Sequence, residues 1–127
     1  MRAEKQIKRI PDAELVVMQA VWDCNTPATR GEIEEHLQDG SAHAQTTLLT
    51  ELARLAEKGF LAVAKEGRNN LYTPTVTREA YLASQSKSFI EKTCGGSMSL
   101  FANALCDSGL SEDDLKELQR LLKRGKR

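Results

Sequence analysis

The sequence predicts a mostly α-helical protein with a small β-wing. A winged helix-turn-helix covers residues 1–75, and a helical region that we expect to dimerise covers residues 76–127. Three observations lead to this prediction. Three amphipathic segments follow one another with only short turns between them, which is helix-turn-helix order. Two runs with strand character come directly after the third segment, as a wing does. Beyond residue 76, three more short apolar stripes occur that hold too little to form a core alone.

The first two helices are marked by their starts. A helix from about Asp12 to Asp23 is expected because Pro11 suits a helix start. Two acidic residues in its first turn also suit the positive end of the helix dipole. Thr29 and Glu32 have the spacing of a capping box, so a second helix begins there. This places a short turn between the two helices.

The third helix carries the strongest functional signal. It is predicted to run from near Ala44 to Gly59, with leucines on one side of the helical wheel. The other side begins with small hydroxyls and methyls, and residues 41–50 contain no Asp, Glu, Lys or Arg. Such a face can enter the major groove of DNA and reach base edges and phosphates. The candidate DNA-contacting residues of this helix are Thr46, Thr47, Thr50 and Arg54. The alternatives are a solvated face and a pairing of Arg54 with a carboxylate of its own domain.

A hairpin is predicted next. Residues 60–65 alternate as a strand does, residues 66–70 are turn-rich, and residues 71–75 form a second strand in which Pro74 implies an edge or a strand end. The hairpin would be a wing with Arg68 at its tip, where a guanidinium suits a phosphate or the minor groove. Arg9, which precedes the first helix, is a further candidate for contact with DNA.

The C-terminal region is read as three short helices. Thr77 caps a fourth helix that ends near Thr93, a fifth follows Gly95 and Gly96, and Ser111 caps a sixth. Helices this small seldom stand alone, and a second copy of the chain is the simplest partner for their apolar stripes. A two-fold dimer would place two third helices about one DNA turn, or a small multiple, apart. The residues expected to dimerise are Leu82, Phe89, Leu115, Leu118 and Leu122.

Charge and cysteine usage set limits on these expectations. The chain is neutral overall, and residues 1–75 carry nine Lys and Arg against eleven Asp and Glu. DNA binding therefore requires that the positive groups gather on one surface. The three cysteines are widely spaced, which indicates free thiols, no metal site and no cofactor. No nucleophile–base pairing or phosphate loop predicts an enzyme. The polar N-terminus and the short apolar runs predict a cytoplasmic chain without membrane insertion.

Several motifs together resemble the penicillinase-repressor (BlaI/MecI/CopY) family. The third-helix run from Thr46 to Gly59 resembles the family's signature, and the segment from Ala13 to Asp23 resembles its first helix. The run from Gly67 to Pro74 is similar to the family's wing, and the pair Gly95–Gly96 to its break between the fourth and fifth helices. The resemblance covers the chain from Ile10 to about Leu122.

This resemblance implies a cytoplasmic transcriptional repressor that binds a palindromic operator in double-stranded DNA as a homodimer. In antibiotic-responsive members, a membrane sensor-protease triggers cleavage in the fifth helix, by itself or through a downstream protease. That region corresponds to Asn103 and Ala104, where the family pattern has Asn followed by Phe. The Cys-x-Cys ending of the copper-responsive branch is not present, since no cysteine follows Cys106.

Two other functions compete with repression. A winged helix that binds a protein instead of DNA is favoured by the neutral charge, and it predicts no binding to DNA at low salt. A metal or small-molecule sensor of similar fold would use Cys94 and Cys106 as ligands, and it predicts a stoichiometric metal that is lost on Cys→Ser change.

Overall fold

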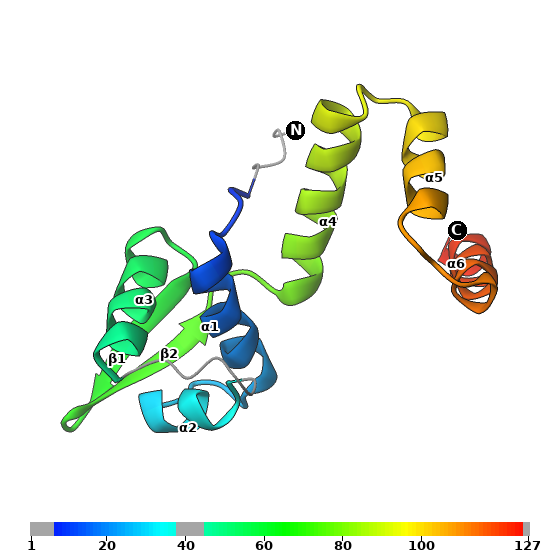
Figure 1. Cartoon of the computed structure of the whole chain (residues 1–127). Coiled ribbons are helices and arrows are strands. Elements are labelled where there is room, and N and C mark those ends of the chain that lie inside the picture. Colours follow the sequence, from blue (N-terminus) through cyan, green and yellow to red (C-terminus); the bar gives the residue numbers. More distant parts are fainter. Residues whose placement is uncertain (1–6, 38–44, 126–127) are drawn as a thin grey trace. The chain divides into compact units, whose positions relative to one another are not determined.

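The computed structural model describes residues 7–37 and 45–125 (Figure 1). The elements in chain order are α1 (Asp12–Asp23), α2 (Arg30–Glu35), α3 (Gln45–Glu57), β1 (Leu61–Glu66), β2 (Asn69–Pro74), α4 (Arg78–Ser88), a π-helical turn η1 (Phe89–Thr93), α5 (Met98–Asp107) and α6 (Glu112–Gly125). This order confirms the predicted fold class. The chain divides into two compact units between Gln85 and Ser86. We call them the winged-helix unit and the C-terminal unit.

The winged-helix unit is built around the packing of α1 on α3. Apolar residues at helical spacing on the two helices turn toward each other, and Ile33 of α2 and Tyr72 of β2 close the same core. The largest fully buried side chains are Ile10, Val17, Met18, Val21, Ile33, Leu48, Leu52 and Leu55. Each contributes about 1.5–3 kcal/mol by its removal from water. This core holds α3 in place, so its outer side is presented on a rigid support.

The predicted helix starts are confirmed in atomic detail. The backbone N–H of Thr29 donates to the Glu32 carboxylate at 2.9 Å, and the Glu32 N–H donates to the Thr29 hydroxyl at 3.2 Å, which completes the capping box. At α6, Ser111 and Asp114 exchange bonds of the same kind. The predicted start of the third helix at Ala44 lies outside the described residues.

The wing differs from the prediction in two respects. Its turn is shorter than expected, because Glu66 pairs with Asn69 and only Gly67 and Arg68 connect the strands. Gly67 has φ +64°, and a glycine at the first central position is the pattern of a type II′ hairpin turn. The alternation of residue types over residues 60–65, which predicts the strand, is also not accompanied by alternating burial. Residues 62–66 are exposed on both faces, because a two-stranded hairpin that projects from the core has nothing packed over it.

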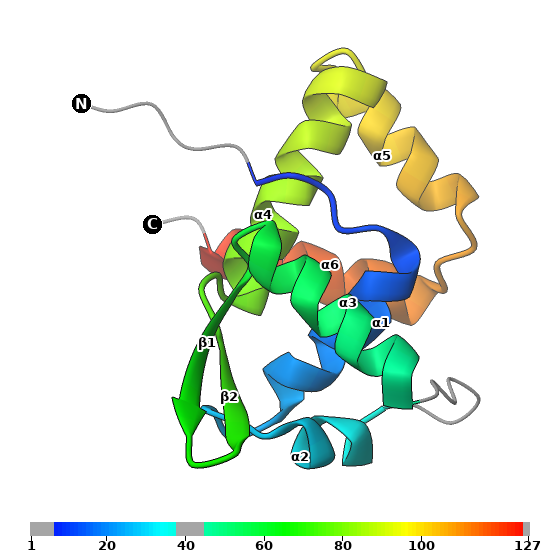
Figure 2. The same cartoon turned by 90° about the vertical axis from the view of Figure 1, so that its left-hand side faces the viewer.

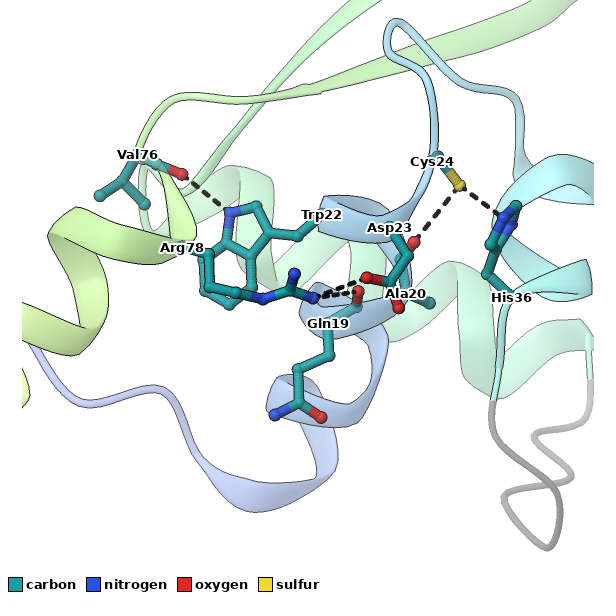
Figure 3. Close-up of polar contacts among 8 residues, drawn as sticks. All are labelled: Gln19, Ala20, Trp22, Asp23, Cys24, His36, Val76 and Arg78. Carbon is teal, nitrogen blue, oxygen red and sulfur yellow. Dashed lines mark hydrogen bonds and ion pairs between the residues drawn. The ribbon is translucent and has the colours of Figure 1, made fainter. Parts of the chain in front are cut away.

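The first turns of α4 belong to the winged-helix unit. Arg78 donates to Asp23 at 2.8 Å and to the carbonyl of Gln19, and its guanidinium lies 5.5 Å from the ring centroid of Trp22 (Figure 3). Further along, the Tyr81 hydroxyl accepts from the N–H of Ile10 at 2.8 Å. These contacts explain why the two units divide after Gln85 and not at residue 75, where the sequence places the boundary.

The C-terminal unit contains α5, α6 and the end of the fourth helix. The predicted helix to Thr93 is observed, but its last residues, Phe89–Thr93, are π-helical. The rings of Phe89 and Phe101 meet edge-on at 6.0 Å. Within residues 86–125, Cys94 is the only buried residue. This unit therefore has no core of its own. No helix in the described ranges is long and apolar enough to span a membrane.

Candidate nucleic-acid interface

The outer side of α3 carries the candidate reading residues. Because Leu48, Leu52 and Leu55 are fully buried, the helix is held with Thr47, Thr50 and Arg54 exposed. These three positions are spaced i, i+3 and i+7, so they form one row along the helix. The side chain of Thr46 lies outside the described residues. The structure therefore brings three of the four predicted α3 residues to one surface.

The charge of this surface suits a polyanion. From Thr47 to Arg54 the chain contains one acid, Glu51, and it is buried. The exposed part of the same stretch carries the positive charge of Arg54. In the described part of the chain, Arg54 takes part in no ion pair, so the alternative of a carboxylate partner finds no support there. Between Thr47 and Arg54 the exposed side chains of α3 therefore include no acid, and the next exposed acid of the helix is Glu57 at its C-terminal end.

A hollow of about 380 Å³ lies beside α3, where the wing meets the first turn of α2. Paired backbone bonds between Ala28 and Tyr72 (2.8 and 3.0 Å) tie the wing to the segment before α2. The C-terminal end of α3 leads directly into β1 of the hairpin (Figure 2). The residues lining the hollow are Thr29, Arg30, Gly31, Leu49, Arg68, Asn69, Asn70 and Tyr72. They include two arginines and no acid, although Arg30 also bonds Glu34 at 2.7 Å. We call this the wing hollow.

The wing tip bears out the predicted position of Arg68. Its exposed side chain sits in the two-residue turn and also lines the wing hollow. In the described ranges it makes no ion pair. The arginine is therefore available to an external anion, and it lines the same hollow as Leu49 of α3.

Arg9 lies elsewhere. It pairs with Asp12 at 2.9 Å, and both side chains are largely exposed. It lines a second hollow, of about 490 Å³, together with Lys58 and Gly59 at the C-terminal end of α3. The structure therefore does not place Arg9 in the hollow that Leu49 and Arg68 line, and its contact with DNA stays a prediction.

Sequence reasoning missed a partly buried ion pair, which involves Lys58 of the same hollow that Arg9 lines. The Glu14 carboxylate, whose side chain is 7% exposed, accepts from the Lys58 ammonium at 2.7 Å. The sequence indicated only that Glu14 suits the helix dipole. No local signal links two residues 44 positions apart, so the pair emerges only when α1 packs on α3.

Cys24 and His36 lie side by side in the winged-helix unit, with Cys24 Sγ 3.4 Å from His36 Nδ1 (Figure 3). The Cys24 thiol also donates to the carbonyl of Ala20 at 3.3 Å. Burial raises the pKa of this thiol, and the negative charges of nearby acids, Glu32 first, raise it further. A protonated thiol is a poor nucleophile and a poor metal ligand. All three cysteines are free, and within the described ranges no group of three or more His, Cys, Asp or Glu could hold a metal ion.

Comparison with known proteins identifies the family. The family model of the penicillinase repressor matches residues 10–124. The penicillinase repressor of Bacillus licheniformis is 36% identical over 123 residues, which are 96% of this chain and 95% of that protein. The methicillin resistance regulatory protein MecI of Staphylococcus aureus is 32% identical over 114 residues, which are 89% of this chain and 92% of that protein.

Solved structures match the winged-helix part. The solution structure of the DNA-binding domain of the repressor BlaI has a TM-score of 0.51 and 37% identity, and the match covers 61% of this chain and 94% of that one. The monomeric form of Bacillus licheniformis BlaI, solved in complex with the blaP half-operator, has a TM-score of 0.50 and the same identity and coverage. The chain therefore belongs to the penicillinase-repressor family of winged-helix, DNA-binding repressors, which are not enzymes.

Proposed function

We propose that this protein is a cytoplasmic repressor that binds a palindromic operator as a homodimer and blocks transcription sterically. The observation that carries the proposal is the outer side of α3 from Thr47 to Arg54, which exposes no acid and lies beside the wing hollow, in a fold that a relative uses on a half-operator. In each protomer α3 enters a major groove. Thr46, Thr47 and Thr50 face base edges, while Arg54 and Arg68 contact phosphates.

The exposed apolar residues of α4 to α6 support the homodimer. Leu82, Phe89 and Leu122 are exposed, Leu115 and Leu118 are half-buried, and the C-terminal unit buries only Cys94 within residues 86–125. Apolar side chains gain free energy when a partner covers them. A second copy of the chain is the partner that a palindromic operator requires, because both are two-fold symmetric.

Release by proteolysis fits the same arrangement. Asn103 and Ala104 are exposed in α5, and a cut between them would separate α6 from the remainder of the chain. Loss of α6 would remove part of the dimer interface and so weaken operator binding. A membrane sensor-protease, or a protease downstream of it, is the partner implied. The intact mass of the chain recovered from induced and uninduced cells tests this step, with Asn103→Ala plus Ala104→Gly as the variant expected to resist the cut.

Footprinting on the DNA upstream of the protein's own gene tests the main proposal. We expect protection of an inverted repeat whose half-sites lie about one helical turn, or a small multiple, apart. The rival function is a winged helix that binds protein. It gains support from the net negative charge of residues 1–75 and predicts no protection even at low salt. An unprotected promoter together with a monomeric protein would contradict the proposal.

Two sets of variants separate the roles within the interface. Arg68→Ala should weaken binding to all sequences alike and lower the salt slope by about 1, because one phosphate contact is lost. Thr47→Ala plus Thr50→Ala should change the preference among sequences by about 1–3 kcal/mol if the two threonines touch bases. Arg120→Ala and Thr93→Ala, both exposed in the C-terminal unit, are the matched controls. The opposite pattern would show that these roles are wrongly assigned.

A further inference from the structure

Leu49 is an apolar side chain exposed in the middle of the proposed reading surface. It is 42% exposed, although it follows the fully buried Leu48. A single exposed leucine is ordinary on a protein surface and is not by itself a site. Its surroundings make it informative, because Leu49 is the one aliphatic residue among the described residues that line the wing hollow. The others supply hydrogen-bond donors or positive charge.

The outer side of α3 therefore carries two rows of different chemistry. Thr47, Thr50 and Arg54 form a polar row. Leu49 and Ala53, four residues apart and both exposed, form a second row that presents methyl groups, and Leu49 of this row lines the wing hollow. A polar row matches hydrogen-bonding base edges and phosphates. A row of methyl groups requires something apolar beside it.

The major groove presents one such apolar group. Of the four bases, only thymine carries a methyl group, at C5, on its major-groove edge. The donors around Leu49 also suit the environment of a base edge: Arg68 and the side-chain amides of Asn69 and Asn70 can face phosphates of the strand that holds the base. Because the described residues that line the hollow include no acid, they do not repel a DNA strand that approaches Leu49.

We propose that Leu49 reads a thymine in each half-site by contact with its C5-methyl group. The inference rests on the proposed entry of α3 into the major groove and adds a specificity residue to it. Contact with Leu49 excludes water from the methyl group, so removal of that methyl should weaken binding roughly three- to tenfold, as expected for about one to two methylene-sized groups.

The test uses duplex DNA that the wild-type protein itself selects from a random pool. Each thymine of the selected sequence is replaced in turn by deoxyuridine, which lacks only the C5-methyl group. We expect one position per half-site at which wild type loses roughly three- to tenfold in affinity. Leu49→Ala should bind more weakly and should no longer distinguish thymine from uracil at that position. Val63→Ala is the matched control, because Val63 is an equally exposed aliphatic residue on β1, and it should keep the full sensitivity.

A second variant tests the same contact by a change of preference. Leu49→Gln should favour adenine at the position where wild type favours thymine, because a glutamine amide can bond adenine at N6 and N7. Retention of the thymine-to-uracil effect in a folded Leu49→Ala protein would overturn the inference, as would a wild type that is indifferent to every replacement. Selection of no DNA by wild type would overturn this inference and the proposed function together. If wild type selects a DNA sequence but Leu49→Ala does not change the thymine-to-uracil effect, this inference alone is overturned.

Discussion

The two units of this chain differ in how far they bury their apolar side chains. The winged-helix unit buries its large apolar residues within itself, and eight of them are fully buried. The C-terminal unit leaves Met98, Leu100 and Leu122 more than half exposed and, within residues 86–125, buries only Cys94. A unit with a core can hold a reading surface rigid by itself. For the unit without a core, we propose that the second copy of the chain supplies the missing cover, so that its stability depends on dimerisation.

This difference fits the proposed roles of the two units, DNA binding for the winged-helix unit and dimerisation for the C-terminal unit. Rigid support under α3 favours recognition, because the positions of Thr47 and Thr50 are set before any DNA arrives. In the proposed dimer, the dependence of the C-terminal unit on its partner would make operator binding sensitive to any change that disrupts this contact, including a cut in α5. The following predictions test the comparison, beginning with the largest expected effect.

Removing core volume should affect the winged-helix unit most strongly. Leu52→Ala creates a cavity at a fully buried position, and we expect a loss of about 2–5 kcal/mol in the free energy of unfolding. Urea denaturation of the full chain measures it. Val63→Ala, at a position 44% exposed in the same unit, should change stability little. Equal losses for both variants would mean that the core does not support this unit as described.

Shortening two leucines of α6 should affect assembly more than folding. Leu118→Ala plus Leu122→Ala removes apolar surface from one side of the helix, so we expect dimerisation to weaken about 10- to 100-fold, or about 1.4–2.8 kcal/mol. Sedimentation equilibrium over a range of concentrations measures this change, with circular dichroism to verify helix content. Lys116→Ala plus Arg120→Ala has the same number of substitutions on the same helix and should leave association nearly unchanged. An unaltered dimer in the leucine variant would remove α6 from the interface.

Breaking the Glu14–Lys58 pair should have a moderate effect within the winged-helix unit. Lys58→Met leaves a nearly buried carboxylate without its cation, at an expected cost of about 1–2 kcal/mol in the free energy of unfolding. The loss is limited because Lys58 is 43% exposed and water screens the pair. Arg9→Met, which removes the exposed partner of Asp12, is the control and should cost far less. Comparable costs would show that burial of Glu14 does not matter.

The smallest expected effect concerns thiol reactivity. Cys106 is exposed in the C-terminal unit, whereas Cys24 is half-buried and the pKa of its thiol is raised by burial and by nearby acids. The thiolate is the reacting form of a cysteine. Because the pKa of Cys24 is raised, its alkylation rate should increase only at a higher pH than the alkylation rate of an ordinary thiol. Mass spectrometry of iodoacetamide-treated protein across a pH series measures both rates. Cys24 reacting ahead of Cys106 at neutral pH would contradict this assignment.

Much of the fold could be predicted because its signals lie within a few residues of one another. The capping box of Thr29 and Glu32, the cap at Ser111 and the left-handed Gly59 each involve neighbours in sequence, and all are found in the structure. The hairpin was also predicted, but its turn was placed too broadly. Turn-favouring residue types at positions 66–70 do not reveal which of them pair across the strands.

The sequence by itself determined the order of the elements, their caps, and the leucine side of α3, because helical periodicity and capping are local properties of the chain. Only the tertiary structure decided that Glu14 meets Lys58, that Arg78 ties α4 to α1, and that Leu49 stands exposed at the wing hollow. Each of these depends on how distant segments pack. Whether a side chain at the edge of an apolar helical stripe is buried depends on which other segment packs beside it. The sequence pattern of one helix gives no information about that segment.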